Sequence, residues 1–157
     1  MNYEIRELGP DDLDLMGLLL DCFADAFDEW ETYTGNRPDP GYLASLLRSD
    51  MFIALVARVN GSVVGGLTAY ELKKYEQSRS EIYIYDLAVA KDARRRGIAT
   101  ALIEALGHIA AERGAWVMFV QADYIDEPAI SLYSGLGVRE DVLHFDIPPK
   151  VKGHART

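Results

Sequence analysis

The residues best suited to chemistry are three consecutive arginines followed by a glycine, at positions 94–97. They stand between an apolar, strand-like stretch at residues 82–89 and a stretch with helical spacing at residues 98–110. The free N–H groups and the positive dipole end of a helix start form a ready anion site. Glycine lets the backbone approach a ligand with no Cβ in the way. This order predicts a strand, a pyrophosphate-binding loop and a helix. The alternative is a basic helix start on a solvated face, which would have the same sequence pattern.

A single carboxylate, Asp86, interrupts the apolar stretch between Tyr85 and Leu87. Strand interiors disfavour Asp, so this carboxylate is expected to be poorly solvated unless it binds a ligand. Burial would raise its pKa, whereas a bound ammonium would lower it. Asp86 is therefore a candidate for binding a cation. The alternative is a structural Asp that pairs with a neighbouring arginine.

The elements that must position these groups follow from periodicity and from turn residues. Asn60-Gly61 predicts a tight hairpin, because both turn positions need positive φ. Gly114 is a helix stop, and Pro128 can open a helix. The expected strands are residues 2–8, 52–59, 62–72, 82–89 and 115–121, with one or two closing strands in 138–147. The expected helices begin near residues 13, 41, 98 and 128.

This order predicts an α/β fold with a mixed, mostly antiparallel sheet and helices on both faces. If strands 82–89 and 115–121 run parallel and splay apart, a ligand crevice should lie outside their carboxyl ends. We expect one domain over residues 1–149 and a flexible tail over 150–157, since 157 residues are hardly enough for two domains.

Composition excludes several classes of protein. The formal net charge of −9 disfavours nucleic acid and favours a cationic partner, although acidity could also serve only solubility. No window has the apolar length of a membrane helix. Cys22 is the only cysteine, which excludes an internal disulfide and fits a reducing cytoplasm. It has no basic partner nearby in sequence, so a packed thiol is expected, and the three histidines show no metal-ligand spacing.

Two motifs carry a resemblance to a known family. Arg94-x-x-Gly97-x-Ala99, following such a strand, resembles the acyl-CoA loop of the GNAT superfamily of N-acetyltransferases. Ala129-x-x-Leu132-Tyr133-x-x-x-Gly137 resembles the second signature of that superfamily. On these two motifs, residues 50–147 resemble that superfamily. SEIYIYDLAV at 80–89, RRGIATALI at 95–103, VQADYIDEPA at 120–129 and the terminal HFDI are similar to the GNAT-type aminoglycoside 3-N-acetyltransferases.

The resemblance implies transfer of acetyl from acetyl-CoA to the 3-amine of a 2-deoxystreptamine aminoglycoside such as gentamicin, the chemistry of antibiotic resistance. Composition and spacing alone give only a cationic acceptor. An ammonium must lose a proton before it attacks, so a base is needed, and we assign that role to Asp86, directly or through water. The matching signature assigns Tyr133 to the departing thiolate. By physics alone, Tyr133 would be a half-buried core residue.

The remaining site residues are expected in two groups. Coenzyme contacts are assigned to Leu87, Ala88, Val89, Arg94, Arg95, Arg96, Gly97, Ile98, Ala99, Thr100, Ala129 and Tyr133. A backbone N–H near Leu87 to Val89 should polarise the thioester carbonyl. Acceptor contacts are assigned to Asp86, Asp123, Asp126 and Glu127, with Glu81, Asp28, Glu29 and Asp146 behind them. Loop charges are usually solvated, which is the alternative for each.

Other functions remain open at this stage. A polyamine or protein-amine acetyltransferase would use the same acidic cleft, and a CoA-binding sensor would share the fold without turnover. A homodimer is compatible with the sequence, but no contact patch can be assigned. Direct attack in a ternary complex is expected, because no placed cysteine exists to carry an acetyl group. No metal is expected.

Overall fold

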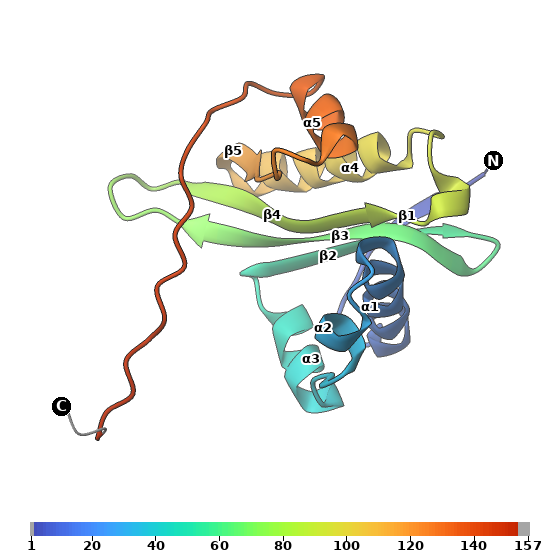
Figure 1. Cartoon of the computed structure of the whole chain (residues 1–157), viewed down its shortest axis with the longest axis horizontal. Helices are drawn as coiled ribbons and strands as arrows, with labels where there is room; N and C mark the ends of the chain where they lie inside the picture. The colour runs from blue at the N-terminus through green and yellow to red at the C-terminus, as the bar shows by residue number, and fades with distance from the viewer. Residues whose placement is uncertain (1, 154–157) are drawn as a thin grey trace. The chain divides into compact units, whose positions relative to one another are not determined.

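The computed structural model describes residues 2–153 (Figure 1). It consists of two compact units, Met1–Gln121 and Ala122–Thr157, and each is described by itself. No helix in the described range is long and apolar enough to cross a membrane, and residues 2–153 contain no cluster of three potential metal-ligating side chains. The expectation of one domain over residues 1–149 stays a prediction.

The first unit is built on a mixed five-stranded sheet with strand order β1-β2-β3-β4-β5. The strands are β1 (Glu4–Glu7), β2 (Phe52–Val59), β3 (Ser62–Lys73), β4 (Ser80–Val89) and β5 (Ala115–Val120). The first three pairings are antiparallel, and β4 pairs with β5 in parallel. The predicted mixed, mostly antiparallel sheet is therefore confirmed. So is the predicted hairpin turn, because Asn60 and Gly61 have φ values of 50° and 83°.

Helices cover both faces of this sheet, as the sequence predicts (Figure 1). Helices α1 (Leu13–Phe27), α2 (Trp30–Thr34) and α3 (Pro40–Arg48) lie on one face, and α4 (Ile98–Arg113) lies on the other. Apolar side chains of α1 and α3 form the core on the first face, where Leu19, Phe23 and Leu47 pack with residues of β2. The long buried runs of β2 and β3 follow from this burial on both faces.

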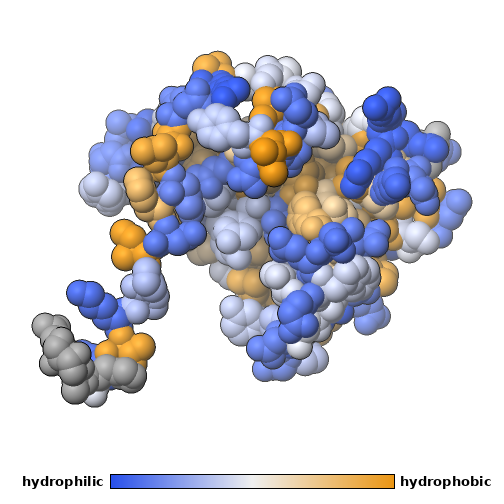
Figure 2. Space-filling view, viewed as in Figure 1, coloured by the Kyte–Doolittle hydropathy of each residue, from blue (hydrophilic) through white to orange (hydrophobic). Residues whose placement is uncertain are grey.

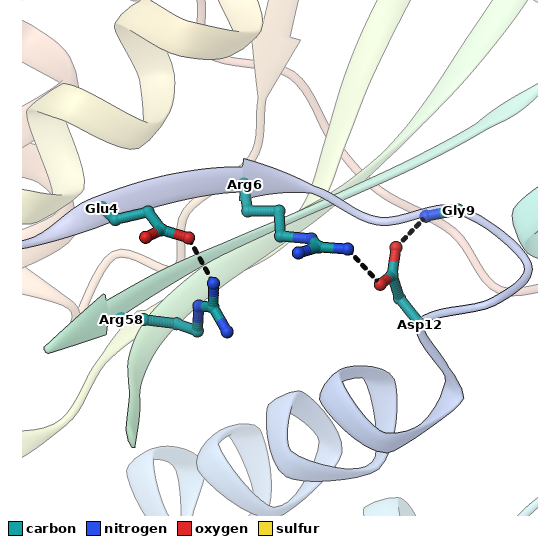
Figure 3. Close-up of polar contacts among 5 residues, drawn as sticks. All are labelled: Glu4, Arg6, Gly9, Asp12 and Arg58. Carbon is teal, nitrogen blue, oxygen red and sulfur yellow. Dashed lines mark hydrogen bonds and ion pairs between the residues drawn. The ribbon is translucent and has the colours of Figure 1, made fainter. Parts of the chain in front are cut away.

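Helix α1 does not continue into α2, because Asp28 turns the chain with a left-handed φ of 54°. A non-glycine residue seldom adopts this conformation, and the sequence analysis did not identify the break. At the other end of α1, the Asp12 carboxylate accepts hydrogen bonds from the Gly9 N–H and from Arg6 instead of capping the helix (Figure 3). Glu4 and Arg58 join β1 to β2 nearby.

The second unit holds helix α5 (Glu127–Ser134) and the extended segment that follows it. The Asp126 carboxylate caps this helix by accepting from the Ala129 N–H at 3.2 Å. The closing strands predicted in residues 138–147 are wrong, because no strand occurs there. Alternating side chains make a strand only where a neighbouring strand supplies hydrogen-bond partners, and the five-stranded sheet does not include this segment. Its apolar side chains stay exposed, as Phe145 at 74% and Ile147 at 87% show. Figure 2 shows orange, hydrophobic side chains along the extended segment.

Candidate active site

The pairing between strands β4 and β5 ends halfway along β4, as expected from the sequence. Their parallel pairing runs from Ser80 opposite Ala115 to Ile84 opposite Val120, where β5 ends. Strand β4 continues for five residues more, to Val89, paired only with β3. Alternate N–H and C=O groups of residues 85–89 therefore point to an edge that β5 leaves free. Leu87, Ala88 and Val89 lie in this free stretch, so an extended ligand with amide groups could pair with it.

The loop after β4 brings the backbone into α4 through two left-handed residues. Arg95 has a φ of 62° and Gly97, at the N-cap, has a φ of 77°. Successive N–H groups in such turns form a concave anion site, and the first N–H groups of α4 add to it. The loop is anchored to the strand by Arg94, whose Nε donates to the Val89 carbonyl at 3.0 Å.

The residues of this loop fit a pyrophosphate. All three arginine side chains are exposed, and Ile98, Ala99 and Thr100 form the first turn of α4. A Cβ added at Gly97 would meet nothing within 4 Å, so the space beside it is open. Glycine is required here mainly by its positive φ, which strains other residues. The close approach assumed from the sequence is compatible with this open space.

A β-bulge places Asp86 on the face of the sheet that carries helices α1 to α3. In the pairing of β3 with β4, Thr68 lies opposite Asp86 and Ala69 lies opposite Ile84, so Tyr85 is an extra residue without a partner. Strict alternation would put Asp86 on the same face as Ile84. The bulge shifts that alternation, and Asp86 reaches helix α2.

Asp86 accepts a hydrogen bond from Tyr33 of α2, at 3.0 Å between the tyrosine oxygen and Oδ2. No arginine pairs with Asp86 among the described residues, so the alternative of an Asp–Arg pair is not supported. Burial raises the pKa of Asp86, the Tyr33 hydrogen bond opposes that rise, and the nearby charge of Glu29 adds to it. A carboxylate with a raised pKa is better matched to accepting a proton near neutral pH.

Tyr33 is a residue of the candidate site that was not predicted from the sequence. Its ring packs against Phe23 and Phe27 of α1, with centroids 5.8 Å away in both cases. Burial and the charge of Asp86 raise the pKa of Tyr33, so its hydroxyl stays protonated and donates. The acidic and aromatic stretch at 25–33 was a signal for this site, but it did not indicate a partner 53 residues away.

The other predicted acceptor residues of the first unit do not all gather at Asp86. Glu29 is near enough for its charge to act on Asp86, and Asp28 ends α1. Glu81 lies five residues before Asp86 on β4, about 17 Å along an extended strand. Its carboxylate lies 3.8 Å from the Lys74 ammonium, and this pairing accounts for its charge.

The predicted residues of the second unit lie in and around α5. Tyr133 is partly buried in this helix, where burial and then the charge of Asp126 raise its pKa to about 12. It is therefore protonated at neutral pH and able to donate. Ala129 lies in the first turn of α5, and Asp123 and Glu127 are exposed around it. Asp146 pairs with His144 at 2.9 Å in the extended segment.

Cys22 is partly buried in α1, and its environment keeps the thiol protonated. Burial raises its pKa, Asp25 adds to the rise, and Arg94 opposes it. A thiol rather than a thiolate is a poor nucleophile. This agrees with the predicted packed thiol and gives no support to a cysteine-bound acetyl group.

The first unit thus combines a splayed parallel strand pair, a loop before α4 whose backbone could bind an anion, and a carboxylate on the splayed strand. The family model described as Acetyltransferase (GNAT) family matches residues 14–138. The chain belongs to the GNAT family of acetyltransferases.

Two solved structures of high similarity are aminoglycoside acetyltransferases from an uncultured soil metagenomic sample. One is 62% identical, covers 96% of this chain and 100% of its own, and has a TM-score of 0.94. The other, in complex with sisomicin, is 33% identical, covers 94% of this chain and 97% of its own, and has a TM-score of 0.87.

A curated relative is the probable N-acetyltransferase camello of Xenopus laevis. It is 30% identical over 105 residues, which are 67% of this chain and 46% of the relative. The chain thus spans less than half the length of that relative.

Proposed function

We propose that the protein N-acetylates a polycationic amine with acetyl-CoA, and that the acceptor is the 3-amine of a 2-deoxystreptamine aminoglycoside. The observation that carries this proposal is the position of Asp86. This partly buried carboxylate lies, because of the bulge in β4, on the sheet face opposite to α4. It lies within the stretch of β4 that β5 leaves unpaired. The two aminoglycoside acetyltransferases of similar structure support the acceptor class.

The proposed coenzyme contacts follow the geometry of the first unit. The pyrophosphate would be held by the concave backbone of residues 95–97 and the first N–H groups of α4, with the exposed arginines adding charge. The free edge of β4 at Leu87 to Val89 would hold the extended arm of the coenzyme by strand-like pairing. When bound, acetyl-CoA supplies an activated acetyl carbonyl.

Asp86 would bind the acceptor ammonium and take the proton that the nitrogen must lose before it can attack. Its raised pKa makes it a better base than an ordinary carboxylate. One backbone N–H at the free edge of β4 would donate to the thioester oxygen. Tyr133, which keeps its proton at neutral pH, would donate to the departing sulfur.

A thiol-release assay tests this proposal. The protein is incubated with acetyl-CoA in separate mixtures, each of which contains one acceptor: gentamicin, kanamycin, spermidine or a peptide with a free N-terminus. The proposal expects CoA release that depends on the aminoglycosides. CoA release with spermidine or the peptide, but not with the aminoglycosides, would support acetyltransferase activity and contradict the proposed acceptor. Tight acetyl-CoA binding without release in any mixture would favour a CoA-binding sensor.

A further inference from the structure

Four aromatic side chains form a row across the sheet, on the face that carries α1 to α3. The strand register places Phe52 opposite Tyr70, Tyr70 opposite Tyr83 and Tyr83 opposite Phe119, so the row crosses strands β2 to β5. Phe52 and Tyr70 are 5.3 Å apart between centroids, and Tyr83 stacks on Phe119 at 4.7 Å. Cross-strand aromatic packing explains these four rings.

Tyr85 is not explained by that packing. It is the extra residue of the bulge, yet its ring contacts Tyr70 and Tyr83 at 5.8 and 5.7 Å and so joins the row on the same face. Phe52 is buried, whereas Tyr85 is 61% exposed. A large, exposed ring that lies where β4 loses its β5 partner and contacts two neighbouring rings presents an aromatic surface to solvent.

The bulge therefore brings an exposed ring and a carboxylate to one side of β4, at consecutive positions. Asp86 uses Oδ2 to accept from Tyr33, and no hydrogen bond among the described residues engages its Oδ1. The face of an aromatic ring attracts a cation, and a carboxylate attracts the same cation and its N–H groups. Tyr33, Tyr70 and Tyr83 all lie close enough to feel the charge of Asp86.

We propose that Tyr85 and Asp86 together form the binding site for the acceptor ammonium, with Tyr85 supplying a cation–π contact and an apolar surface. This inference rests on the proposed function and deepens it. The site selects a primary ammonium whose neighbouring carbon atoms carry C–H groups that can lie against the ring, such as the amine of an aminocyclitol. The ring contacts the carbon atoms beside the nitrogen, and the free Asp86 oxygen accepts from the ammonium.

The test compares two substitutions at one exposed position, by calorimetric titration of the acceptor. Tyr85→Phe keeps the ring, whereas Tyr85→Leu removes it and keeps an apolar side chain. Tyr85→Leu is expected to weaken gentamicin binding about 2- to 30-fold, the range of a cation–π contact. Tyr85→Phe is expected to stay within about twofold of the wild type. Acetyl-CoA affinity should be the same in all three proteins.

Tyr75→Leu is the matched control, because Tyr75 is 97% exposed in the segment between β3 and β4. Its gentamicin affinity should not change. Equal affinity of Tyr85→Leu and wild type, or equal losses in Tyr85→Leu and Tyr85→Phe, would overturn the inference. If the wild type does not bind gentamicin, the same proteins are titrated with spermidine, and failure to bind either cation also overturns it.

Binding and turnover separate the two proposals. If cations bind with the expected pattern but no acceptor releases CoA, the ammonium site stands and the proposed function fails. If gentamicin is acetylated and Tyr85→Leu binds it normally, the proposed function stands and the site at Tyr85 fails.

Discussion

Tyr33 donates a hydrogen bond to Asp86, at 3.0 Å, and so links helix α2 to strand β4. Two influences on the pKa of Asp86 oppose each other at this position. Burial favours the neutral form of the Asp86 carboxyl, and the tyrosine hydrogen bond favours its charged form. Tyr33 thereby orients one carboxylate oxygen and limits how far the pKa of Asp86 rises. We infer that Tyr33 is a positioning residue for the proposed base.

Tyr33→Phe should move the pH dependence of turnover. Without the hydrogen bond, the pKa of Asp86 rises further, and a base acts only when it is ionised. The acid limb of the kcat profile is expected to shift to higher pH, with roughly tenfold lower kcat below neutral pH. Tyr75→Phe, at an exposed position, should leave the profile unchanged. An unmoved acid limb in Tyr33→Phe would argue for a merely structural tyrosine.

Asp86→Asn should remove the proposed base without removing the acceptor of the Tyr33 hydrogen bond. We expect kcat to fall by about 10²- to 10⁴-fold, the usual contribution of general base catalysis. The dissociation constant of acetyl-CoA should not change, since the coenzyme contacts lie on the free edge of β4 and in the loop. Near-normal turnover of this variant in a thiol-release assay would remove Asp86 from the reaction.

The same substitution should stabilise the fold at neutral pH. The folded chain binds the Asp86 proton more tightly than the unfolded chain, because the folded pKa lies above its ordinary value of 3.8. This carboxyl therefore weakens the fold as pH rises through that raised pKa. Asp86→Asn should have the higher melting temperature at pH 7, and the difference should disappear below about pH 4. A lower melting temperature at pH 7 would contradict the assigned burial.

Gly97→Ala and Gly61→Ala form a matched pair for the anion-binding loop. Both glycines have positive φ and open space beside them, so each alanine should cost about 1–2 kcal/mol of folding free energy. Only Gly97→Ala should also weaken acetyl-CoA binding, because Gly97 is the N-cap of α4 and lies in the proposed pyrophosphate loop. Denaturant titration measures the first effect, and calorimetry the second. Equal acetyl-CoA affinities of the two variants would place the pyrophosphate elsewhere.

Arg113 should matter for stability rather than activity. One of its terminal nitrogens donates to Glu71 at 2.7 Å and to the Asp50 carbonyl at 2.5 Å, joining the end of α4 to β3. Burial pushes the pKa of Glu71 up, but the hydrogen bond and charge of Arg113, together with contributions from Ser80 and Lys73, hold that pKa low. Arg113→Met leaves a buried carboxylate unpaired and should cost about 2 kcal/mol.

The exposed Arg139–Asp141 pair provides the control for that loss. Arg139→Met should change the unfolding midpoint very little, because exposed ion pairs contribute little to stability. The loss in Arg113→Met should also shrink as pH falls, since a lowered Glu71 pKa stabilises the fold only above the unfolded value. Equal losses in both variants would contradict the assigned burial of Glu71.

Local signals made much of the fold and part of the site predictable. Asn60-Gly61 fixed the hairpin, and the interruption of an apolar strand by Asp86 marked the residue that lies beside the free edge of β4. The bulge at Tyr85 was not predictable, because it depends on how β4 aligns with β3. Tyr33 was missed for a similar reason, since its partner comes from a distant strand.

Other expectations show what the sequence pattern alone cannot decide. Glu81 and Asp86 are both carboxylates of β4, yet Glu81 forms an ion pair with Lys74, whereas Asp86 accepts a hydrogen bond from Tyr33. Residues 138–147 alternate like a strand but form none, and the sheet does not include them. The cytoplasmic location, the homodimer and the role of Tyr133 stay predictions.

The most direct measurement is the structure of the product that the protein makes from gentamicin and acetyl-CoA, determined by NMR. We expect one acetyl group on the 3-amine of the deoxystreptamine ring, in a product that Asp86→Asn does not form. Acetylation at another amine would contradict the assigned position. Gentamicin left unmodified, by a protein that binds acetyl-CoA, would contradict the proposed acceptor.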